Sequence, residues 1–330
     1  MRRKKSFSVP RLMALVFILF LVIIIAVTII SFVRADRIMN IAPSPLDPFA
    51  TNVIGKHQNV SFRSAEDQYT LKGWWLPHTT KDPKGTVILI HDRGANRLQF
   101  SLDTHHLYSF FTDSGFNVLA FDQRGCGDSS SGLHAYGYNV YEDVLAAIKY
   151  AKGKTPSLPL ILMGYGAGNS AIWHAWNSLP SSLDEQVETA NADEINLSRN
   201  DISGIIMDTP AKSTEDCIKS DIDATRLPLR KLFYWSIPLA IRLSTSNSAD
   251  LDFLNLILDA PCPIYMTRNK FDEVYPPENI NSLFSEVARL RSSTATIFET
   301  EGQGHVTGWL DQQGAYKDEL GKFLQQWFGN

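Results

Sequence analysis

The sequence predicts an α/β fold, in which a mostly parallel central sheet carries helices on both faces and follows one transmembrane helix. Strand-like apolar runs alternate with helix-like segments along most of the chain, as parallel strands joined by crossover helices require. An uncharged apolar stretch near the N-terminus is long enough to cross a bilayer as a helix. With 330 residues and 44% hydrophobic composition, the chain can bury one large core and carry a small cap.

The apolar stretch covers residues 12–33, and its flanking charges predict its orientation. Only Arg34 and Arg37 follow it closely, whereas basic residues are concentrated before it, at Arg2, Arg3, Lys4, Lys5 and Arg11. This asymmetry predicts a single-pass protein of the cell membrane, with a cytoplasmic N-terminus and an extracytoplasmic C-terminal part. A cleaved signal peptide is the alternative, but its apolar region would be ~7–15 residues long and would end in small residues. The sequence around Arg34 lacks such a cleavage site, so we favour an uncleaved anchor.

The chain divides into three parts. Residues 1–35 form the basic tail and the anchor, residues 36–58 contain several prolines and suit an extended linker, and residues 59–330 form the globular domain. Strands are expected at 59–63, 69–76, 86–91, 117–122, 158–163, 204–208, 263–267 and 294–299, of which the first two pair as an antiparallel hairpin. Helices are expected from residue 167 onward and near 98–114, 139–152, 278–290 and 313–328.

Two insertions interrupt this alternation. Residues 181–200 are polar and acidic, which predicts a solvated surface loop. Residues 209–260 are too many for an ordinary connection and contain a helical pattern around 227–243, which predicts a cap over the carboxyl edge of the sheet. The stretch 226–243 mixes aromatic with basic residues. Three interpretations stay open: a lining for a small apolar, acyl or peptide ligand, a surface that touches lipid headgroups, or a helix that only packs on the sheet.

Charge and cysteine content exclude several classes of protein. The net charge of −4 and the lack of a basic stripe interleaved with aromatic residues argue against a nucleic-acid partner. Cys126, Cys217 and Cys262 are widely spaced, so they allow at most one disulfide and do not have the spacing of metal ligands. We expect three partly buried thiols, no metal and no cofactor. No protein partner follows from the sequence.

The chain is organised around a point where a buried strand turns sharply into a helix. The apolar run Leu160-Ile161-Leu162-Met163 is followed by Gly164-Tyr165-Gly166-Ala167-Gly168 and then by a helix-compatible segment. Glycines spaced by two at such a turn are typical of the nucleophile elbow Gly-x-Ser-x-Gly. The central residue here is Gly166, which has no nucleophilic side chain and tolerates the positive φ of an elbow without strain.

Further motifs follow other predicted strands. They are His91-Asp92-Arg93-Gly94-Ala95-Asn96-Arg97, Asp122-Gln123-Arg124-Gly125-Cys126-Gly127-Asp128-Ser129, Asn269-Lys270-Phe271-Asp272-Glu273-Val274-Tyr275-Pro276 and Gly302-Gln303-Gly304-His305. Together with the elbow, their order and spacing give residues from about 60 to 328 a resemblance to the α/β-hydrolase superfamily, closest to its serine peptidase and esterase-like branches.

This resemblance implies a catalytic site. It assigns the triad acid to Asp272 and the triad base to His305, in the chain order nucleophile, acid, base. It also implies an oxyanion hole made by the N–H of Ala167 and an N–H of Asp92 or Arg93, although Asp92 replaces a glycine that is usual there. The motif at 122–129 is implied to be mainly structural. A lone Asp or His would be read as a turn or loop residue, but the two in this spacing are better explained as a pair.

No other side chain replaces the missing nucleophile well. Hydroxyls and thiols lie nearby at Tyr165, Ser170, Cys126, Ser129, Ser130 and Ser131. A helix turns Ser170 away, a phenol is a weak nucleophile, and the others require their loop to fold inward. We therefore predict a pseudohydrolase or an impaired hydrolase whose nucleophile position, at Gly166, is vacant. The alternative is a working ester, thioester or peptide hydrolase that uses Asp272 and His305 with an activated water or a substitute nucleophile.

Overall fold

A computed structural model of the chain describes residues 9–329 except 43, 65, 183–195, 226, 247–248 and 276. Its centre is an eight-stranded sheet in the order β1-β2-β4-β3-β5-β6-β7-β8. β1 pairs antiparallel with β2 and β2 antiparallel with β4, whereas all other neighbours are parallel. The predicted mostly parallel sheet is therefore confirmed. The strands are β1 (Gln58–Ser64), β2 (Tyr69–Leu76), β3 (Gly85–Ile90), β4 (Phe116–Phe121), β5 (Leu160–Tyr165), β6 (Ile202–Asp208), β7 (Ile264–Asn269) and β8 (Ala295–Thr300).

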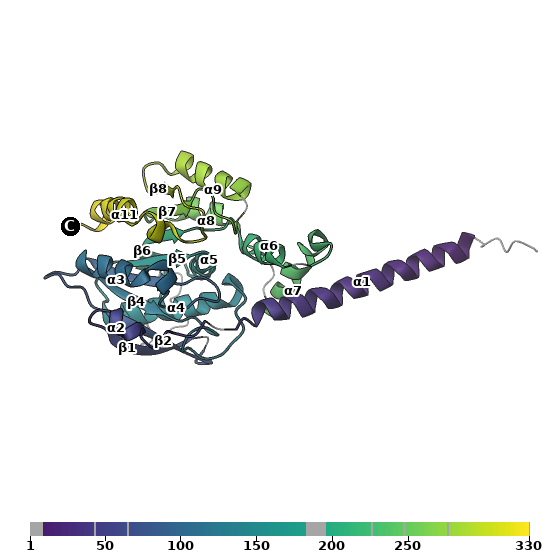
Figure 1. Cartoon of the computed structure of the whole chain (residues 1–330), viewed down its shortest axis with the longest axis horizontal. Coiled ribbons are helices and arrows are strands. Elements are labelled where there is room, and N and C mark those ends of the chain that lie inside the picture. The colour runs from purple at the N-terminus through teal and green to yellow at the C-terminus, as the bar shows by residue number, and fades with distance from the viewer. Residues whose placement is uncertain are drawn as a thin grey trace, which may run out of the picture.

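Helices cover both faces of the sheet (Figure 1). α4 (Gly137–Lys154), α5 (Gly168–Ser178) and α9 (Pro277–Leu290) share one core cluster, and α3 (Thr104–Asp113) and α11 (Gln313–Phe328) share the other. Every residue of β3, β4 and β5 is buried because both faces of these strands are covered, which explains their continuous apolar runs. Shorter helical segments are α2 (Ala50–Val53), α10 (Gly308–Asp311), η1 (Phe100–Leu102) and η3 (Arg199–Asp201).

The N-terminal helix α1 (Val9–Met39) projects from the domain and packs on it only near its C-terminal end (Figure 1). It is long and apolar enough to cross a membrane, and most of its side chains are exposed. Ser31, Ala35 and Met39, spaced by one helical turn, are buried against the domain. Because Ala35 and Met39 pack on the domain from the same helix face, α1 extends past residue 35. Residues 36–39 are therefore helical, where an extended linker was expected.

The insertion between β6 and β7 folds as a helical cap. It comprises α6 (Thr214–Ala224), η4 (Arg230–Phe233), α7 (Ser236–Ser244) and α8 (Phe253–Asp259). The single helix expected around 227–243 is divided into η4 and α7, and Pro238 lies in the first turn of α7, where it breaks no helical hydrogen bond. α7 packs along α1, and the hydroxyl oxygens of Ser31 and Ser236 are hydrogen-bonded at 2.8 Å. The other expected insertion, 181–200, lies mostly outside the described residues.

Candidate active site

The predicted elbow lies between β5 and α5 at the carboxyl edge of the sheet. Gly166 has a φ of +48°, a left-handed conformation that strains most other residues. Its N–H donates to the carbonyl of Asp208 at the end of β6 (3.0 Å), which ties the turn to the neighbouring strand. Gly168 lets α5 begin close to β3, since an added Cβ would lie 2.5 Å from the carbonyl oxygen of Ile90. The sharp strand-to-helix turn is thus present without a side chain at its apex.

Asp272 and His305 come from the loops after β7 and β8 and meet at the same edge. Nδ1 of His305 lies 2.9 Å from Oδ2 of Asp272. The other oxygen of Asp272 accepts the N–H groups of Val274 (2.7 Å) and Tyr275 (3.0 Å). Because only 3% of the Asp272 side chain is exposed, these bonds fix the carboxylate, which in turn orients the imidazole. The structure therefore brings together the two residues that the resemblance assigns as acid and base.

Two backbone N–H groups converge beside the elbow, but they bind a side chain of the protein itself. Oδ1 of Asp92 accepts the N–H of Arg93 at 2.7 Å and the N–H of Ala167 at 2.8 Å. His91 orients this loop: its Nε2 accepts the N–H of Gln123 (3.0 Å), so Nδ1 carries the proton and donates to the carbonyl of Asp92 (2.7 Å). Asp92 was expected as an alternative N–H donor. It enters the hole through its carboxylate instead, because converging N–H groups favour an anion.

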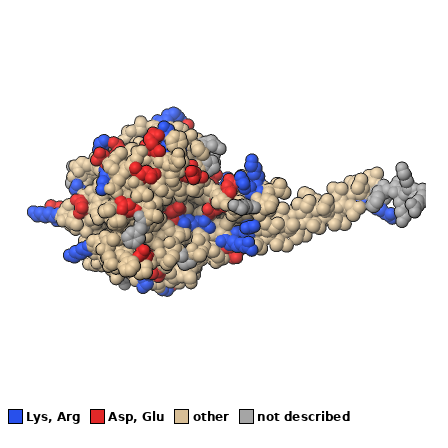
Figure 2. Space-filling model, viewed as in Figure 1, with Lys and Arg blue, Asp and Glu red and all other residues tan. Residues whose placement is uncertain are grey.

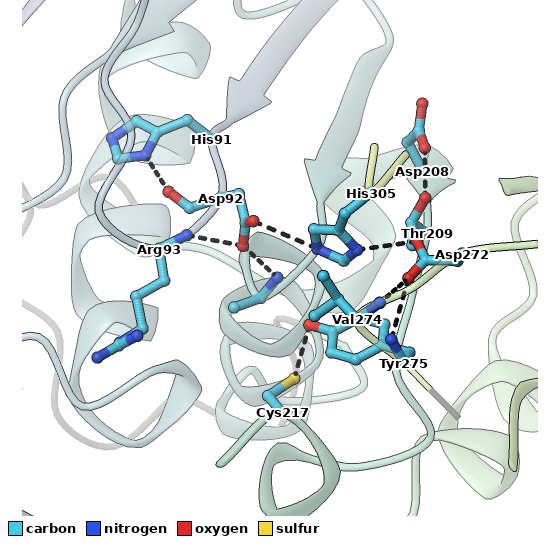
Figure 3. A network of polar contacts seen from close by, with 12 residues as sticks. His91, Asp92, Arg93, Asp208, Thr209, Cys217, Asp272, Val274, Tyr275 and His305 are labelled. Atoms are coloured by element: carbon cyan, nitrogen blue, oxygen red, sulfur yellow. Dashed lines mark hydrogen bonds and ion pairs between the residues drawn. The ribbon is translucent and has the colours of Figure 1, made fainter. Parts of the chain in front are cut away.

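The carboxylate of Asp92 also fills the space above Gly166. It points toward His305 (Figure 3). A Cβ added at Gly166 would lie 2.6 Å from both Cγ and Oδ1 of Asp92. Oδ2 of Asp92 lies 3.4 Å from Nε2 of His305. Carboxylates therefore flank both nitrogens of the imidazole. The position left empty by the missing serine is occupied by a group from the loop after β3.

Comparisons with known proteins agree with this architecture. The family model Hydrolase_4 (serine aminopeptidase, S33) matches residues 81–212. The esterase Pf2001 of Pyrococcus furiosus has a TM-score of 0.63 at 18% identity, covering 87% of this chain and 98% of that one. A carboxyl esterase from Bacillus coagulans has a TM-score of 0.56 at 14% identity, covering 83% and 99%. The chain therefore has the α/β-hydrolase fold, and its residues 81–212 match the serine aminopeptidase family model.

A curated relative matches over a shorter segment. The uncharacterized protein YqkD of Bacillus subtilis (strain 168) is 35% identical over 94 residues, which are 28% of this chain and 28% of that protein. The family match at 81–212 includes Asp92 and Gly166 and ends before Asp272 and His305. The arrangement of those four residues therefore rests on the structure.

The charges around His305 set its protonation state. Burial alone lowers the pKa of a histidine, but Asp272 and Asp92 outweigh it and raise the pKa of His305 to about 10. Burial raises the pKa of Asp92, whereas His305 and the N–H groups of Ala167 and Arg93 lower it, and the net shift is downward. At neutral pH, His305 is therefore an imidazolium between two carboxylates. In that state it has no lone pair with which to accept a proton.

A buried acid that was not expected from the sequence, Asp208, lies behind the elbow. Asp208 is fully buried and accepts the hydroxyls of Thr209 (2.9 Å) and Tyr316 (2.8 Å). Burial raises its pKa to about 6. Its carbonyl accepts the side-chain amide of Asn169 (2.9 Å) in addition to the N–H of Gly166, so Asp208 supports the elbow. The sequence signal that could have indicated Asp208 is its place as an acidic residue at the end of an apolar strand, β6.

Tyr275, also missed, packs against the Asp272–His305 pair. Its ring meets the His305 ring edge-on, with 4.8 Å between ring centroids. Its hydroxyl donates to Sγ of Cys217 (3.3 Å), a buried free cysteine. Cys126 and Cys262 are also free and buried. The contact with Tyr275 restricts the orientation of His305 in addition to its bond with Asp272.

Most of the substitute nucleophiles considered from the sequence are engaged elsewhere. The Ser170 hydroxyl accepts the N–H of Gly137 (3.1 Å) and bonds Thr214 (2.7 Å). The Ser129 hydroxyl donates to the carbonyl of Asp122 (2.6 Å), and Ser130 accepts the N–H of Thr70 (3.0 Å). Ser131 lines a cavity with Ser129 and several glycines of that loop. Burial raises the pKa of the Cys126 thiol to about 12 and raises the pKa of the Tyr165 phenol, so their nucleophilic anions are disfavoured.

Two further features bear on ligands. Asp92 lines a cavity of about 440 Å³ together with the rest of its loop and with residues that follow α1, including Ser44 and Asp47.

Among the described residues, one group of side chains has metal-ligating atoms within 4.8 Å of one another: Asp103, His105 and His106. It includes none of the residues of the candidate active site. Its Asp103 carboxylate already accepts the Gln313 amide (2.6 Å).

Proposed function

We propose that this protein is a membrane-anchored α/β-hydrolase-fold protein without serine-dependent acyl transfer, and thus a pseudohydrolase for that chemistry. The observation that carries this proposal is the Asp92 carboxylate in the oxyanion hole above Gly166. A serine hydrolase needs a nucleophile at the elbow and free N–H donors for the oxygen that becomes negative. Here the nucleophile is absent and a fixed anion occupies the donors.

Electrostatics oppose the displacement of Asp92 by an acyl substrate. Its carboxylate interacts with protonated His305 and with the N–H groups of Arg93 and Ala167. A neutral carbonyl oxygen is a weaker acceptor than a carboxylate, so an ester does not compete well for these donors. A ligand that binds in the cavity of about 440 Å³ and leaves Asp92 in place fits better. This favours a binding role over cleavage.

The proposal includes a single membrane span. α1 is long and apolar enough to cross a bilayer, and basic residues are concentrated before it. The preference of positive charge for the cytoplasmic side orients the N-terminus inward. The membrane is then a partner through α1, and the hydrolase domain is extracytoplasmic.

A second candidate is a hydrolase in which Asp92 is the substitute nucleophile. The observation that favours it is that the two oxygens of Asp92 have different surroundings. Oδ1 accepts the two N–H groups, whereas Oδ2 faces His305. Carboxylates serve as covalent nucleophiles in other enzymes. Oδ2 would attack an electrophilic saturated carbon, and the leaving group would depart with the bonding electrons, which leaves a neutral ester at Asp92.

Hydrolysis of that ester would use the same residues. Once the charge of Asp92 is lost, the pKa of His305 falls and the imidazolium releases its proton to solvent. The neutral His305 can then accept a proton from a water that attacks Cγ. The negative charge on Oδ1 would be stabilised by the N–H groups of Arg93 and Ala167. Collapse of this intermediate would break the bond to the alkoxide, which takes the proton of His305 and leaves as an alcohol. The new carboxylic acid of Asp92 would then give the second proton of the water to His305, which restores the carboxylate, now with one oxygen from water, and the imidazolium.

Two mass-spectrometric experiments test these candidates. A fluorophosphonate probe should leave the protein unlabelled, and stoichiometric labelling of any serine contradicts the pseudohydrolase proposal. Incubation with 1-bromobutane in ¹⁸O-labelled water should leave the Asp92 peptide unchanged in mass if the protein only binds ligands. Incorporation of ¹⁸O at Asp92, together with a trapped butyl ester in a His305→Gln variant, would establish Asp92 as the nucleophile instead.

A further inference from the structure

We infer that the junction between α1 and the cap binds the phosphate headgroup of an anionic membrane phospholipid. This inference rests on the proposed membrane span. A cavity of about 270 Å³, which we call the anchor–cap cavity, is lined there by α1, α6, α7 and the loop after β3. Its walls include Arg34, Arg37, Arg93, Asp221, Leu227 and Ile237. One part of this lining is cationic and another is apolar, as a phospholipid requires.

Guanidinium groups outnumber carboxylates in the anchor–cap cavity. Asp221 is the acidic residue in its lining, and it is already ion-paired with Arg93 and accepts the hydroxyl of Tyr136. Among the described residues, neither Arg34 nor Arg37 has a hydrogen-bond or ion-pair partner. Asp36 lies on the same helix but not in the cavity lining. Unneutralised guanidinium groups attract phosphate oxygens, which arginine can bind in bidentate geometry.

Arg93 contributes a donor that the described part of the chain does not satisfy. Its Nη1 binds Asp221 and its Nη2 donates to the carbonyl of Ile38 (2.6 Å), but its Nε is buried without an acceptor. Buried N–H groups nearly always have a partner, so this unsatisfied donor leaves Arg93 with unused hydrogen-bonding capacity. The backbone N–H of the same residue belongs to the oxyanion hole. Occupation of the anchor–cap cavity therefore contacts the loop that carries Asp92.

The cavity lies where lipid phosphates are expected. The apolar run of α1 ends at residue 33, and Arg34 and Arg37 follow it on adjacent turns. Arginines at this position of a spanning helix reach the headgroup layer. Lys and Arg side chains gather where α1 meets the body of the protein (Figure 2). The cationic wall of the cavity is therefore at the level of the membrane surface.

The cap supplies an apolar surface beside this cationic wall. Large apolar side chains of η4, α7 and the turns before them are exposed, from 36% to 76%, at Leu229, Leu232, Trp235, Leu239 and Leu243. Because α7 packs along α1, this surface continues the apolar surface of the anchor. Exposed apolar patches of this kind mark membrane or partner contacts, and Trp is enriched at the membrane interface. A phospholipid matches both surfaces, whereas free phosphate matches only the guanidinium groups.

Native mass spectrometry of the full chain in detergent, titrated with dioleoyl phosphatidylglycerol, tests the inference. We expect a lipid-bound species whose affinity falls about 5-fold for Arg34→Gln and for Arg37→Gln, and about 30-fold for the double variant, from ~1 kcal/mol per basic residue. A matched control is Arg63→Gln with Arg289→Gln, which removes the same charge from exposed sites on β1 and α9 and should bind as the wild type does. Thr225→Glu, which places a carboxylate in the cavity, should also weaken binding while thermal unfolding stays unchanged.

Three results would overturn the inference. The first is equal lipid affinity of the wild type and the Arg34→Gln/Arg37→Gln variant. The second is a loss of lipid affinity in the Arg63→Gln/Arg289→Gln control as large as that in the Arg34→Gln/Arg37→Gln variant. The third is displacement of the lipid by millimolar glycerol 1-phosphate or inorganic phosphate, since this would make the cavity a site for soluble phosphate. Binding in detergent does not depend on membrane orientation, so a failure of the proposed topology is distinguishable from a failure of this site.

Discussion

Oδ2 of Asp92 lies 3.4 Å from Nε2 of His305, on the side of the imidazole where a serine hydrolase has its nucleophile. The opposite nitrogen lies 2.9 Å from Asp272. One imidazolium therefore links an acid from the loop after β3 to an acid from the loop after β7. A change at either carboxylate therefore alters the pKa of His305.

The first prediction concerns Asp92→Asn, which removes one of the charges that raise the pKa of His305. We expect this pKa to fall from about 10, because burial then opposes Asp272 alone. NMR titration of the imidazole measures the shift. Asp67→Asn, at an exposed carboxylate, is the control and should leave His305 unchanged. If Asp92→Asn also leaves it unchanged, the ion pair does not form.

The same pair predicts how stability depends on pH. The pKa of His305 is higher in the folded protein than its ordinary value of 6.5. Its contribution to the free energy of unfolding is therefore fully present below pH 6.5 and is lost as pH rises toward about 10. In Asp92→Asn this loss should occur at lower pH. Thermal unfolding between pH 6 and pH 10 would measure it, and identical curves for the two proteins would contradict the prediction.

The second prediction concerns the nucleophile position. Gly166→Ser alone should gain no esterase activity, because the new Cβ would meet the Asp92 carboxylate at 2.6 Å. Gly166→Ser combined with Asp92→Gly frees both the space and the N–H donors, so hydrolysis of short-chain esters should rise above background. Adding His305→Ala should abolish the gain. The strained φ opposes the serine by about 1–3 kcal/mol. Activity in the single variant equal to that of the double variant would show that Asp92 does not block the site.

The third prediction concerns the loop that carries Asp92. Arg97 pairs with Asp122 at 2.6 Å, and only 6% of the Arg97 side chain and none of the Asp122 side chain is exposed. Arg97→Met leaves a buried carboxylate without its partner, so we expect a loss of about 3–5 kcal/mol of unfolding free energy. Adding Asp122→Asn should restore part of it. Chemical denaturation measures both changes. If Arg97→Met lowers the free energy of unfolding less than Arg63→Met does at an exposed arginine, the Arg97–Asp122 pair does not stabilise the fold.

The fourth prediction is topological. External protease added to intact cells should digest the domain, because the basic residues before α1 orient its N-terminus toward the cytoplasm. A fusion to the C-terminus that fluoresces only in the cytoplasm should stay dark. Protection of the domain in intact cells, with digestion after lysis, would reverse the orientation.

Much of the fold could be predicted because the central strands are apolar throughout and are separated by turn residues. β3, β4 and β5 lie within two residues of the expected segments, and the elbow follows from glycine spacing. The contact of Asp92 with the elbow could not be predicted in this way. It joins loops 75 positions apart in the chain, and a side chain that crosses between loops leaves no periodic signal. The cap was also incompletely predicted, since most residues of α6 are polar or charged and α8 has only seven residues.

The Ser31–Ser236 hydrogen bond fixes the C-terminal part of α1 to the cap, so that α1 and the cap move together. α1 is one unbroken helix from its apolar run to the residues that pack on the cap, so it cannot turn without carrying the cap with it. A spanning helix tilts when the thickness of the surrounding bilayer changes. With the proposed membrane span, bilayer thickness should therefore set the angle at which the sheet stands over the membrane. Oriented-sample spectroscopy in lipids of different chain length would detect this as a common rotation of α1 and α4.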